Sequence, residues 1–139
     1  MKKLFVSLII IVNSCILTFA IEQPAITLKT SLTAGTEFSL AIGTYNDTTI
    51  HIDWGNGILK EYTTSWDAIM IYDTLQAETI KMYGSTIHYF GVADIIIDTA
   101  DFSNCPNLAY LLMQNCGMSS IDISKNNVLI NCNVVSNKL

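Results

Sequence analysis

The side chains best suited to proton transfer in this sequence are its two histidines, His51 and His88. A histidine acts as a general acid or base only when its ring reaches a substrate proton or a nucleophile. His51 alternates with Ile50 and Ile52, so we expect it to face solvent on a strand. His88 follows Ile87, and neither histidine lies in a nucleophile motif with a Ser or Cys. The sequence therefore predicts no catalytic residue.

Five aspartates raise the question of a calcium site or of paired glycosidase carboxylates: Asp47, Asp53, Asp94, Asp98 and Asp101. Calcium loops place oxygen ligands at alternating close positions, and no run here has that spacing. Glycosidase carboxylates act across a deep cleft, which a small β protein scarcely supplies. Asp53 is expected to support a hairpin turn and the other aspartates to lie on a solvated face. We therefore expect no metal, no cofactor and no enzymatic activity.

Three cysteines, Cys105, Cys116 and Cys132, lie outside the N-terminal segment 1–20. None has the Cys-x-x-Cys spacing of a metal site. Two of them could form a disulfide if the protein reaches an oxidising compartment. Their odd number and their places in a repeat instead predict small buried thiols that stay reduced.

Short strands are predicted between residues 25 and 84. Apolar residues alternate with polar ones around Ile26, Leu40 and Ile52, and this period of two indicates strands with one buried face. Further strands are expected at 68–72 and 78–83. The turn Gly55-Asn56-Gly57 predicts a tight hairpin, because these residues tolerate positive φ. No helix is expected, and the pattern predicts a small antiparallel β-sandwich.

The rest of the chain contains an internal repeat with a 21-residue period. Residues 87–97, 108–118 and 129–139 each follow the leucine-rich template L-x-x-L-x-L-x-x-N/C-x-L, although the first lacks the Asn or Cys. The motif Asp-x-Ser at 101–103 returns at 122–124. One such unit cannot bury its apolar edge alone, so units stack into a parallel sheet. We therefore predict the start of a leucine-rich-repeat solenoid of about two and a half units.

The inward-facing places of this template carry further predictions. After each strand an Asn or Cys turns inward, where an Asn amide satisfies neighbouring loop backbone. Cys116 and Cys132 are accordingly expected in the core of the solenoid. The chain stops at Leu139 within a unit and has no polar capping repeat. Either the sequence is a fragment of a longer protein, or its uncapped C-terminal repeat pairs with something, which includes self-association.

The strand face of the predicted solenoid is the surface best able to carry a function. Template positions that alternate with the apolar ones point outward there. Six of them are predicted as a binding face: Tyr89, Tyr110, Leu112, Gln114, Asn131 and Asn133. Exposed aromatic side chains on a rigid sheet suit an interface. The alternative is ordinary packing between neighbouring rungs.

Residues 1–20 have the three-part pattern of a secretory signal peptide. Lys2 and Lys3 precede an apolar run at 4–12, and the small residues Thr18 and Ala20 suit cleavage. Cys15 offers a lipid anchor as the alternative. We therefore expect a secreted or cell-surface protein, held on a membrane only through lipidation at Cys15.

The charge pattern excludes one class of partner. The chain has a net charge of −5 and no arginine. Nucleic-acid binding needs clustered cations that displace counterions from phosphate. The sequence therefore predicts no nucleic-acid partner, and it has no polybasic stretch for an anionic membrane surface.

Two stretches resemble known families. Residues 49–57 resemble the strand and turn of PKD-like sandwich domains, with Asn56 in place of the usual Asp. With the run at 80–84 and the 21-residue units, nearly all of residues 25–139 resembles bacterial internalin-like leucine-rich-repeat surface proteins. In these proteins a small β domain precedes the repeats.

The resemblance implies a domain plan and a function. The plan is a signal peptide at 1–20, a PKD-like β domain at 21–84 and leucine-rich repeats at 85–139. The implied function is that of an exported, adhesin-like module that contacts a protein or glycan ligand and has no catalytic residues. The alternatives are a structural spacer or cap domain of a larger surface protein, or a non-catalytic remnant of a multidomain hydrolase.

Overall fold

A computed structural model describes residues 8–12, 15–19 and 22–139. The regular elements of these residues are all β-strands, so the predicted mainly β class is confirmed. In chain order they are β1 (Leu8–Val12), β2 (Cys15–Phe19), β3 (Ile26–Lys29), β4 (Glu37–Thr44), β5 (Thr48–Asp53), β6 (Leu59–Thr64), β7 (Ile69–Thr74), β8 (Thr79–Tyr83), β9 (Ile87–Ala93), β10 (Thr99–Asp101), β11 (Tyr110–Gln114) and β12 (Asn131–Asn133).

The first two strands form a sheet of their own. β1 and β2 pair antiparallel, with Leu8 opposite Phe19. Lys2, Lys3 and Ala20, on which the signal peptide depends, lie outside the described residues. The signal peptide therefore stays a prediction. Within residues 8–12, 15–19 and 22–139, no helix is long and apolar enough to cross a membrane.

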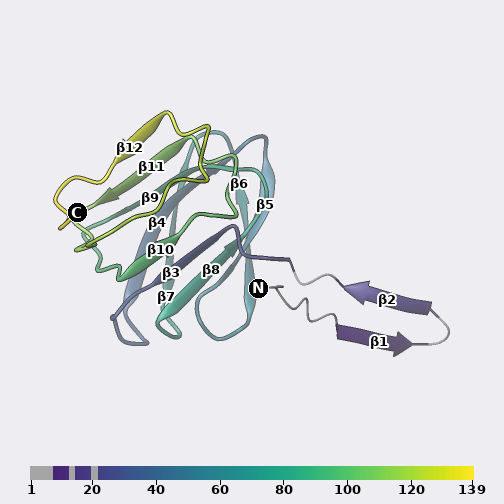
Figure 1. The fold of residues 1–139 in the computed structure, drawn as a ribbon. Helices are drawn as coiled ribbons and strands as arrows, with labels where there is room; N and C mark the ends of the chain where they lie inside the picture. The colour runs from purple at the N-terminus through teal and green to yellow at the C-terminus, as the bar shows by residue number, and fades with distance from the viewer. Residues whose placement is uncertain (1–7, 13–14, 20–21) are drawn as a thin grey trace, which may run out of the picture.

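Two five-stranded sheets make up the main body (Figure 1). The antiparallel sheet has the strand order β10-β3-β8-β5-β6, and the mixed sheet has the order β12-β11-β9-β4-β7. Alternation turns one face of each sheet inward, so that Leu40 and Ile42 of β4 and Ile50 and Ile52 of β5 share one buried core. Burying each such side chain contributes about 1.5–3 kcal/mol. The sandwich architecture is therefore present, with β9 to β12 as part of it.

The predicted hairpin between β5 and β6 is present, but its connection is longer than the tight turn that the sequence predicts. Asp53 pairs with Leu59, so residues 54–58 form the connection. Asp53 Oδ1 accepts hydrogen bonds from the Gly55 and Gly57 N–H groups at 2.8 and 2.9 Å. Gly55 has φ of 114°, and a β-carbon there would lie 2.5 Å from Ala77 N. The expected role of Asp53 in the turn is confirmed, and glycine is required at Gly55.

The mixed sheet is antiparallel on one side of β9 and parallel on the other. β4 pairs antiparallel with β7 and β9, whereas β9, β11 and β12 are parallel neighbours. Tyr110 of β11 lies between Tyr89 and Asn131 in this register. Each step from one strand to the next equals the 21-residue period found in the sequence. The predicted parallel pairing of these three segments is therefore present.

The turns after these strands also repeat. Asp94, Asn115 and Ser136 all have φ between 51° and 59°, and they follow one another at the same 21-residue period. Asp101 Oδ1 accepts from the Ser103 N–H, and Asp122 Oδ1 accepts from the Ser124 N–H, both at 2.9 Å. The Asp-x-Ser motif is thus a short turn in which the carboxylate satisfies a backbone donor.

Inward-facing amides join one unit to the next. Asn137 Oδ1 accepts from the N–H groups of Cys116 and Met118, both at 3.1 Å. The buried Asn126 donates from Nδ2 to the carbonyl oxygens of Phe102 and Cys105 at 3.0 and 2.9 Å. The expected use of an Asn amide to satisfy loop backbone is confirmed at Asn137, and Asn126 does the same at a position that the template does not include.

The thiols of Cys105, Cys116 and Cys132 are free, but they do not share one environment. Cys105 and Cys116 are buried as predicted, whereas Cys132 is exposed. The prediction that Cys132 lies in a core is wrong, although its equivalent in β11, Leu111, is fully buried. The reason is that β12 has β11 on one side and no other strand of the described chain on its opposite side.

Candidate binding face of the mixed sheet

The six residues of the predicted binding face lie together on the mixed sheet. In β11, Tyr110, Leu112 and Gln114 are half-buried, while Leu111 and Met113 between them are fully buried. Tyr89 of β9 lies beside Tyr110 on one side, and Asn131 and Asn133 of β12 flank β11 on the other. Because side chains alternate along a strand, all six share the face that points away from the core.

A groove of about 260 Å³ runs along this outer face. We call it the outer groove. One row of the sheet crosses it from Met70 through Ala41 and Gly91 to Leu112. Ala41 and Gly91 in the middle of this row have little or no side chain, whereas Met70 and Leu112 at its ends have large ones. The complete lining is Ser39, Leu40, Ala41, Met70, Tyr89, Gly91, Val92, Ala93, Leu112 and Gln114.

Sequence reasoning found only part of this groove. Tyr89, Leu112 and Gln114 belong to the predicted face, but Ala41 comes from β4 and Met70 from β7. Both strands lie in the segment that was expected to form a separate β domain. The 21-residue period gives the pairing of β9 with β11, but it contains no signal for the pairing of β9 with β4.

Next to the groove lies an aromatic cluster, of which the sequence predicts only Tyr89 and Tyr110. We define the aromatic cluster as Tyr45, Trp66, His88, Tyr89 and Tyr110. The indole of Trp66 stacks on the His88 imidazole, with ring centroids 4.3 Å apart and an angle of 17° between the planes. The Tyr45 ring lies 4.7 Å from His88 and 5.2 Å from Trp66. The Tyr110 ring connects the cluster to the predicted face, 6.2 Å from His88 and 6.3 Å from Tyr89.

Glycines let these rings lie close to the sheet. A β-carbon on Gly43 would stand 3.2 Å from His88 Cε1 and from Tyr89 Cβ. A β-carbon on Gly91 would stand 3.3 Å from a ring carbon of Tyr89. The register shifts at this point, since Gly43 pairs with Tyr89 but Thr44 pairs with Ile87. His88 is the extra residue of this bulge, which turns its ring out beside Tyr89.

His88 is held in its neutral form. Burial lowers the pKa of its imidazole, and only 2% of the residue is exposed. Its Nδ1 is buried and has no hydrogen-bond partner among the described residues. The aromatic cluster is therefore an uncharged surface at neutral pH.

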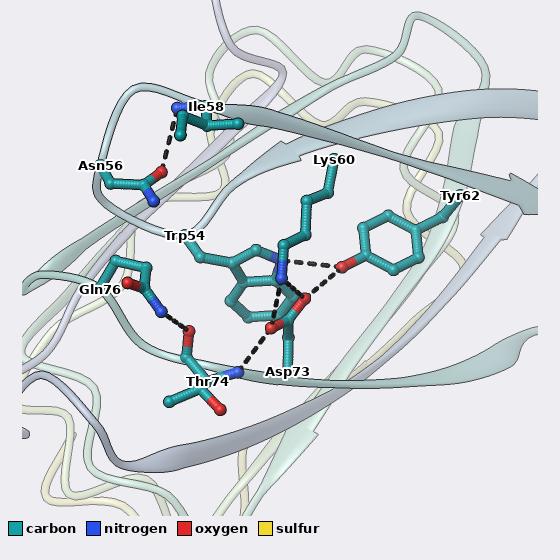
Figure 2. Close-up of polar contacts among 8 residues, drawn as sticks. All are labelled: Trp54, Asn56, Ile58, Lys60, Tyr62, Asp73, Thr74 and Gln76. Carbon is teal, nitrogen blue, oxygen red and sulfur yellow. Dashed lines mark hydrogen bonds and ion pairs between the residues drawn. The ribbon is translucent and has the colours of Figure 1, made fainter.

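A polar network at the edge of the sandwich is a second candidate site (Figure 2). Lys60 Nζ lies 2.8 and 2.7 Å from the two carboxylate oxygens of Asp73, and the Tyr62 hydroxyl donates to Asp73 Oδ2 at 2.7 Å. Trp54 Nε1 donates to the same hydroxyl at 2.9 Å. A hollow of about 610 Å³ opens beside Asp73, also lined by Glu37, Phe38, Ser39, Tyr72 and Thr74.

The contacts of Asp73 favour a structural role for this network. Burial opposes its ionisation, but hydrogen bonds from Lys60, Tyr62 and the Thr74 N–H prevail and lower its pKa. Burial, with the hydrogen bond to Asp73, raises the pKa of Tyr62 to about 12. Both carboxylate oxygens are thus engaged, and they join β6 of one sheet to β7 of the other.

The other residues considered for chemistry lie apart from one another. His51 is on β5 of the antiparallel sheet, 3.7 Å from Glu61, and its side chain is 43% exposed as expected. His88 is on β9 of the mixed sheet. Among the described residues, no three His, Cys, Asp or Glu side chains are placed to hold a metal ion.

Comparison with known proteins adds no relative. No family model, curated protein or solved structure matches this chain.

Proposed function

We propose that this chain is an exported cell-surface binding module that contacts a protein or glycan ligand through the outer face of its mixed sheet. The observation that carries the proposal is the outer groove with the aromatic cluster at its end. Exposed aromatic residues next to a groove are typical of interaction sites. We propose no enzymatic role and no nucleic-acid partner.

We further propose that residues 85–139 are the first units of a leucine-rich-repeat solenoid, preceded by a PKD-like domain. The support is the 21-residue spacing of three parallel strands and of the left-handed residues Asp94, Asn115 and Ser136. The inward amide of Asn137, bonded to two N–H groups of the previous unit, fits the template. In such a solenoid the outer face of the mixed sheet would be the concave face.

A structural spacer is the second candidate function. The observation that favours it is the edge at β12, where Ile130 is 75% exposed and Val135 and Leu139 are also exposed. A spacer would pack a further unit or domain against this edge, and its outer face would bind no ligand. The two functions therefore depend on different surfaces.

An adhesion experiment with matched variants tests the binding role. Beads coated with the full chain are passed over a panel of immobilised glycoproteins and unglycosylated extracellular proteins. Leu112→Glu places a charge in the outer groove, and Leu59→Glu places one on the antiparallel sheet, where Leu59 is 53% exposed. We expect the unmodified chain to hold beads on at least one surface, Leu112→Glu to release them, and Leu59→Glu to have no effect.

Adhesion that survives Leu112→Glu, or no adhesion to any surface, would contradict the binding role. Surface exposure is examined separately, by protease treatment of intact cells that express the chain. Degradation without cell lysis is expected, and full protection would contradict export. Exposed protein that adheres to nothing would favour the spacer.

A further inference from the structure

The aromatic cluster offers an open aromatic surface. Trp66 is 55% exposed, although His88 covers one side of its indole. The other tryptophan, Trp54, is 1% exposed and packs on Phe38 in the core. The cluster is therefore the place where an external molecule can meet an indole face.

The electrostatic character of this surface limits the ligand. None of the side chains in the aromatic cluster or the outer groove carries a charge at neutral pH, because burial lowers the pKa of His88. The chain as a whole has a net charge of −5 and lacks arginine. An anionic ligand would find no cation to pair with here and would be repelled by the rest of the molecule. The surface fits a neutral ligand.

Hydrogen-bonding groups surround the aromatic rings. Tyr89 and Tyr110 provide hydroxyls, and the amides of Gln114, Asn131 and Asn133 follow on β11 and β12. Each of these groups both donates and accepts hydrogen bonds. Such groups match the hydroxyls of a sugar, which also donate and accept.

The position of the groove argues against an added peptide strand. β9 and β4 form its floor in the middle of the mixed sheet, so their backbone groups are already paired with neighbouring strands. Recognition of an extended peptide by strand addition needs an unpaired sheet edge. Only side chains are available in the outer groove, and they favour a flat ligand with an apolar face and a polar rim.

A pyranose ring has that shape, since its axial C–H bonds form an apolar face and its hydroxyls form the rim. The negative face of an aromatic π-system attracts such C–H bonds. Tyr89 belongs to both the aromatic cluster and the outer groove, so one chain of sugars could occupy both. We propose that the aromatic cluster and the outer groove bind a neutral glycan, with one pyranose ring on Trp66 and further rings along the groove. This inference rests on the proposed binding role of the same face.

Binding of defined oligosaccharides tests the inference. The probes are hexasaccharides of β-1,4-linked glucose, mannose and N-acetylglucosamine and of α-1,4-linked glucose, with hexagalacturonate as the anionic comparison. Calorimetry and tryptophan fluorescence of the full chain measure binding. We expect at least one neutral hexasaccharide to bind and to change the fluorescence, because Trp66 is exposed. Hexagalacturonate should not bind.

Matched variants locate the site. Trp66→Ala should weaken binding about tenfold or more, as truncation of an aromatic anchor does, while Trp66→Phe should retain most of the affinity. Leu59→Ala is the control, since Leu59 is similarly exposed on the other sheet. Thermal melting confirms that each variant is folded, which the exposure of both side chains favours.

Three results would overturn the inference: no binding of any neutral hexasaccharide, preferential binding of hexagalacturonate, or full binding by folded Trp66→Ala. Its failure differs from failure of the binding role. Beads that adhere to unglycosylated protein and ignore excess hexasaccharide would retain the binding role and exclude the glycan. Hexasaccharide binding without bead adhesion would retain the glycan site and exclude adhesion as its use.

Discussion

The two units that begin at Leu108 and Leu129 follow the same backbone course but differ in burial. Ala109 N donates to His88 O, and Ile130 N donates to Ala109 O, both at 2.8 Å. Ala109 is nevertheless buried, whereas Ile130 is exposed. The strands differ in the same way, since Leu111 is fully buried and its equivalent Cys132 is exposed.

This difference shows that backbone register and side-chain burial, which the repeat template predicts together, have separate causes. The turns within each unit and the Asn side-chain amides between units determine the backbone register. This register is the same at β11 and β12. Burial depends on the neighbours of each strand, because β11 lies between β9 and β12 whereas β12 has one described neighbour. An apolar residue at a template position therefore shows where the side chain points but not how well it is covered.

The largest expected difference between the units is in thiol reactivity. Burial raises the pKa of Cys105 from 9.0 to about 12, and it also raises the pKa values of Cys116 and Cys132. The thiolate is the reactive species, and a reagent can reach the exposed Cys132 without any opening of the fold. We expect Cys132 to be labelled first in the native protein, and Cys105 and Cys116 roughly a hundredfold or more slowly, because their labelling requires local unfolding. Peptide-resolved mass spectrometry after timed alkylation measures this.

Urea provides the control, because Cys105, Cys116 and Cys132 should react at similar rates once the chain is unfolded. Equal rates for Cys116 and Cys132 in the native protein would mean that the two units do not differ in burial.

The next largest effect concerns stability. Leu111→Ala leaves a cavity between two layers and should lower the free energy of unfolding by about 2–5 kcal/mol. Cys132→Ala, at the equivalent position, should change it by less than about 0.5 kcal/mol because the side chain is exposed. Urea denaturation followed by fluorescence measures both. A large loss for Cys132→Ala would show that β12 is covered in solution, and sedimentation would then show whether self-association covers it.

The same comparison explains what the sequence could predict. The 21-residue period is visible in the chain itself, so the parallel register of Tyr89, Tyr110 and Asn131 follows from it. The role of Asp53 also follows, because the residues it contacts lie within four positions. Local patterns determine local turns and the direction in which a side chain points.

Contacts between distant segments could not be predicted in this way. Nothing in the sequence around Gly43 indicates that it pairs with Tyr89, and this pairing brings Trp66 onto His88. The ion pair of Lys60 with Asp73 depends on how the two sheets face each other. Cys132 is exposed because β12 has only one neighbouring strand among the described residues, and its position in the template does not show this. A large part of the candidate site thus arises from strand pairings that no periodic pattern in the sequence predicts.

A smaller effect is expected from the amide that joins the units. Asn126 is buried and donates to the Phe102 and Cys105 carbonyl oxygens. Asn126→Ala leaves both acceptors without this donor and should lower the free energy of unfolding by about 1–3 kcal/mol. Asn127→Ala is the matched control, because Asn127 is exposed. Urea denaturation of both variants checks this, and equal losses would show that the amide does not join the units.

The smallest expected effect concerns His88, whose equivalents along the repeat are Ala109 and Ile130. The Trp66 and Tyr45 rings cover His88, and burial lowers its pKa from 6.5. The folded state therefore favours the neutral ring, while the unfolded state binds a proton more readily. Its contribution to stability is present above pH 6.5 and is lost as the pH falls through the lower folded-state pKa.

Replacing the two histidines in turn isolates this contribution. His88→Phe keeps a ring under Trp66 and should make the unfolding free energy fall less between pH 7.5 and pH 5 (roughly the range of histidine titration). His51→Gln, at the exposed histidine, is the matched control. Urea denaturation at the two pH values measures the unfolding free energy. If it fell as much for His88→Phe as for the unmodified chain, the aromatic cluster would not shield His88 from water. His88 would then not differ in burial from Ile130, its exposed equivalent in the last unit.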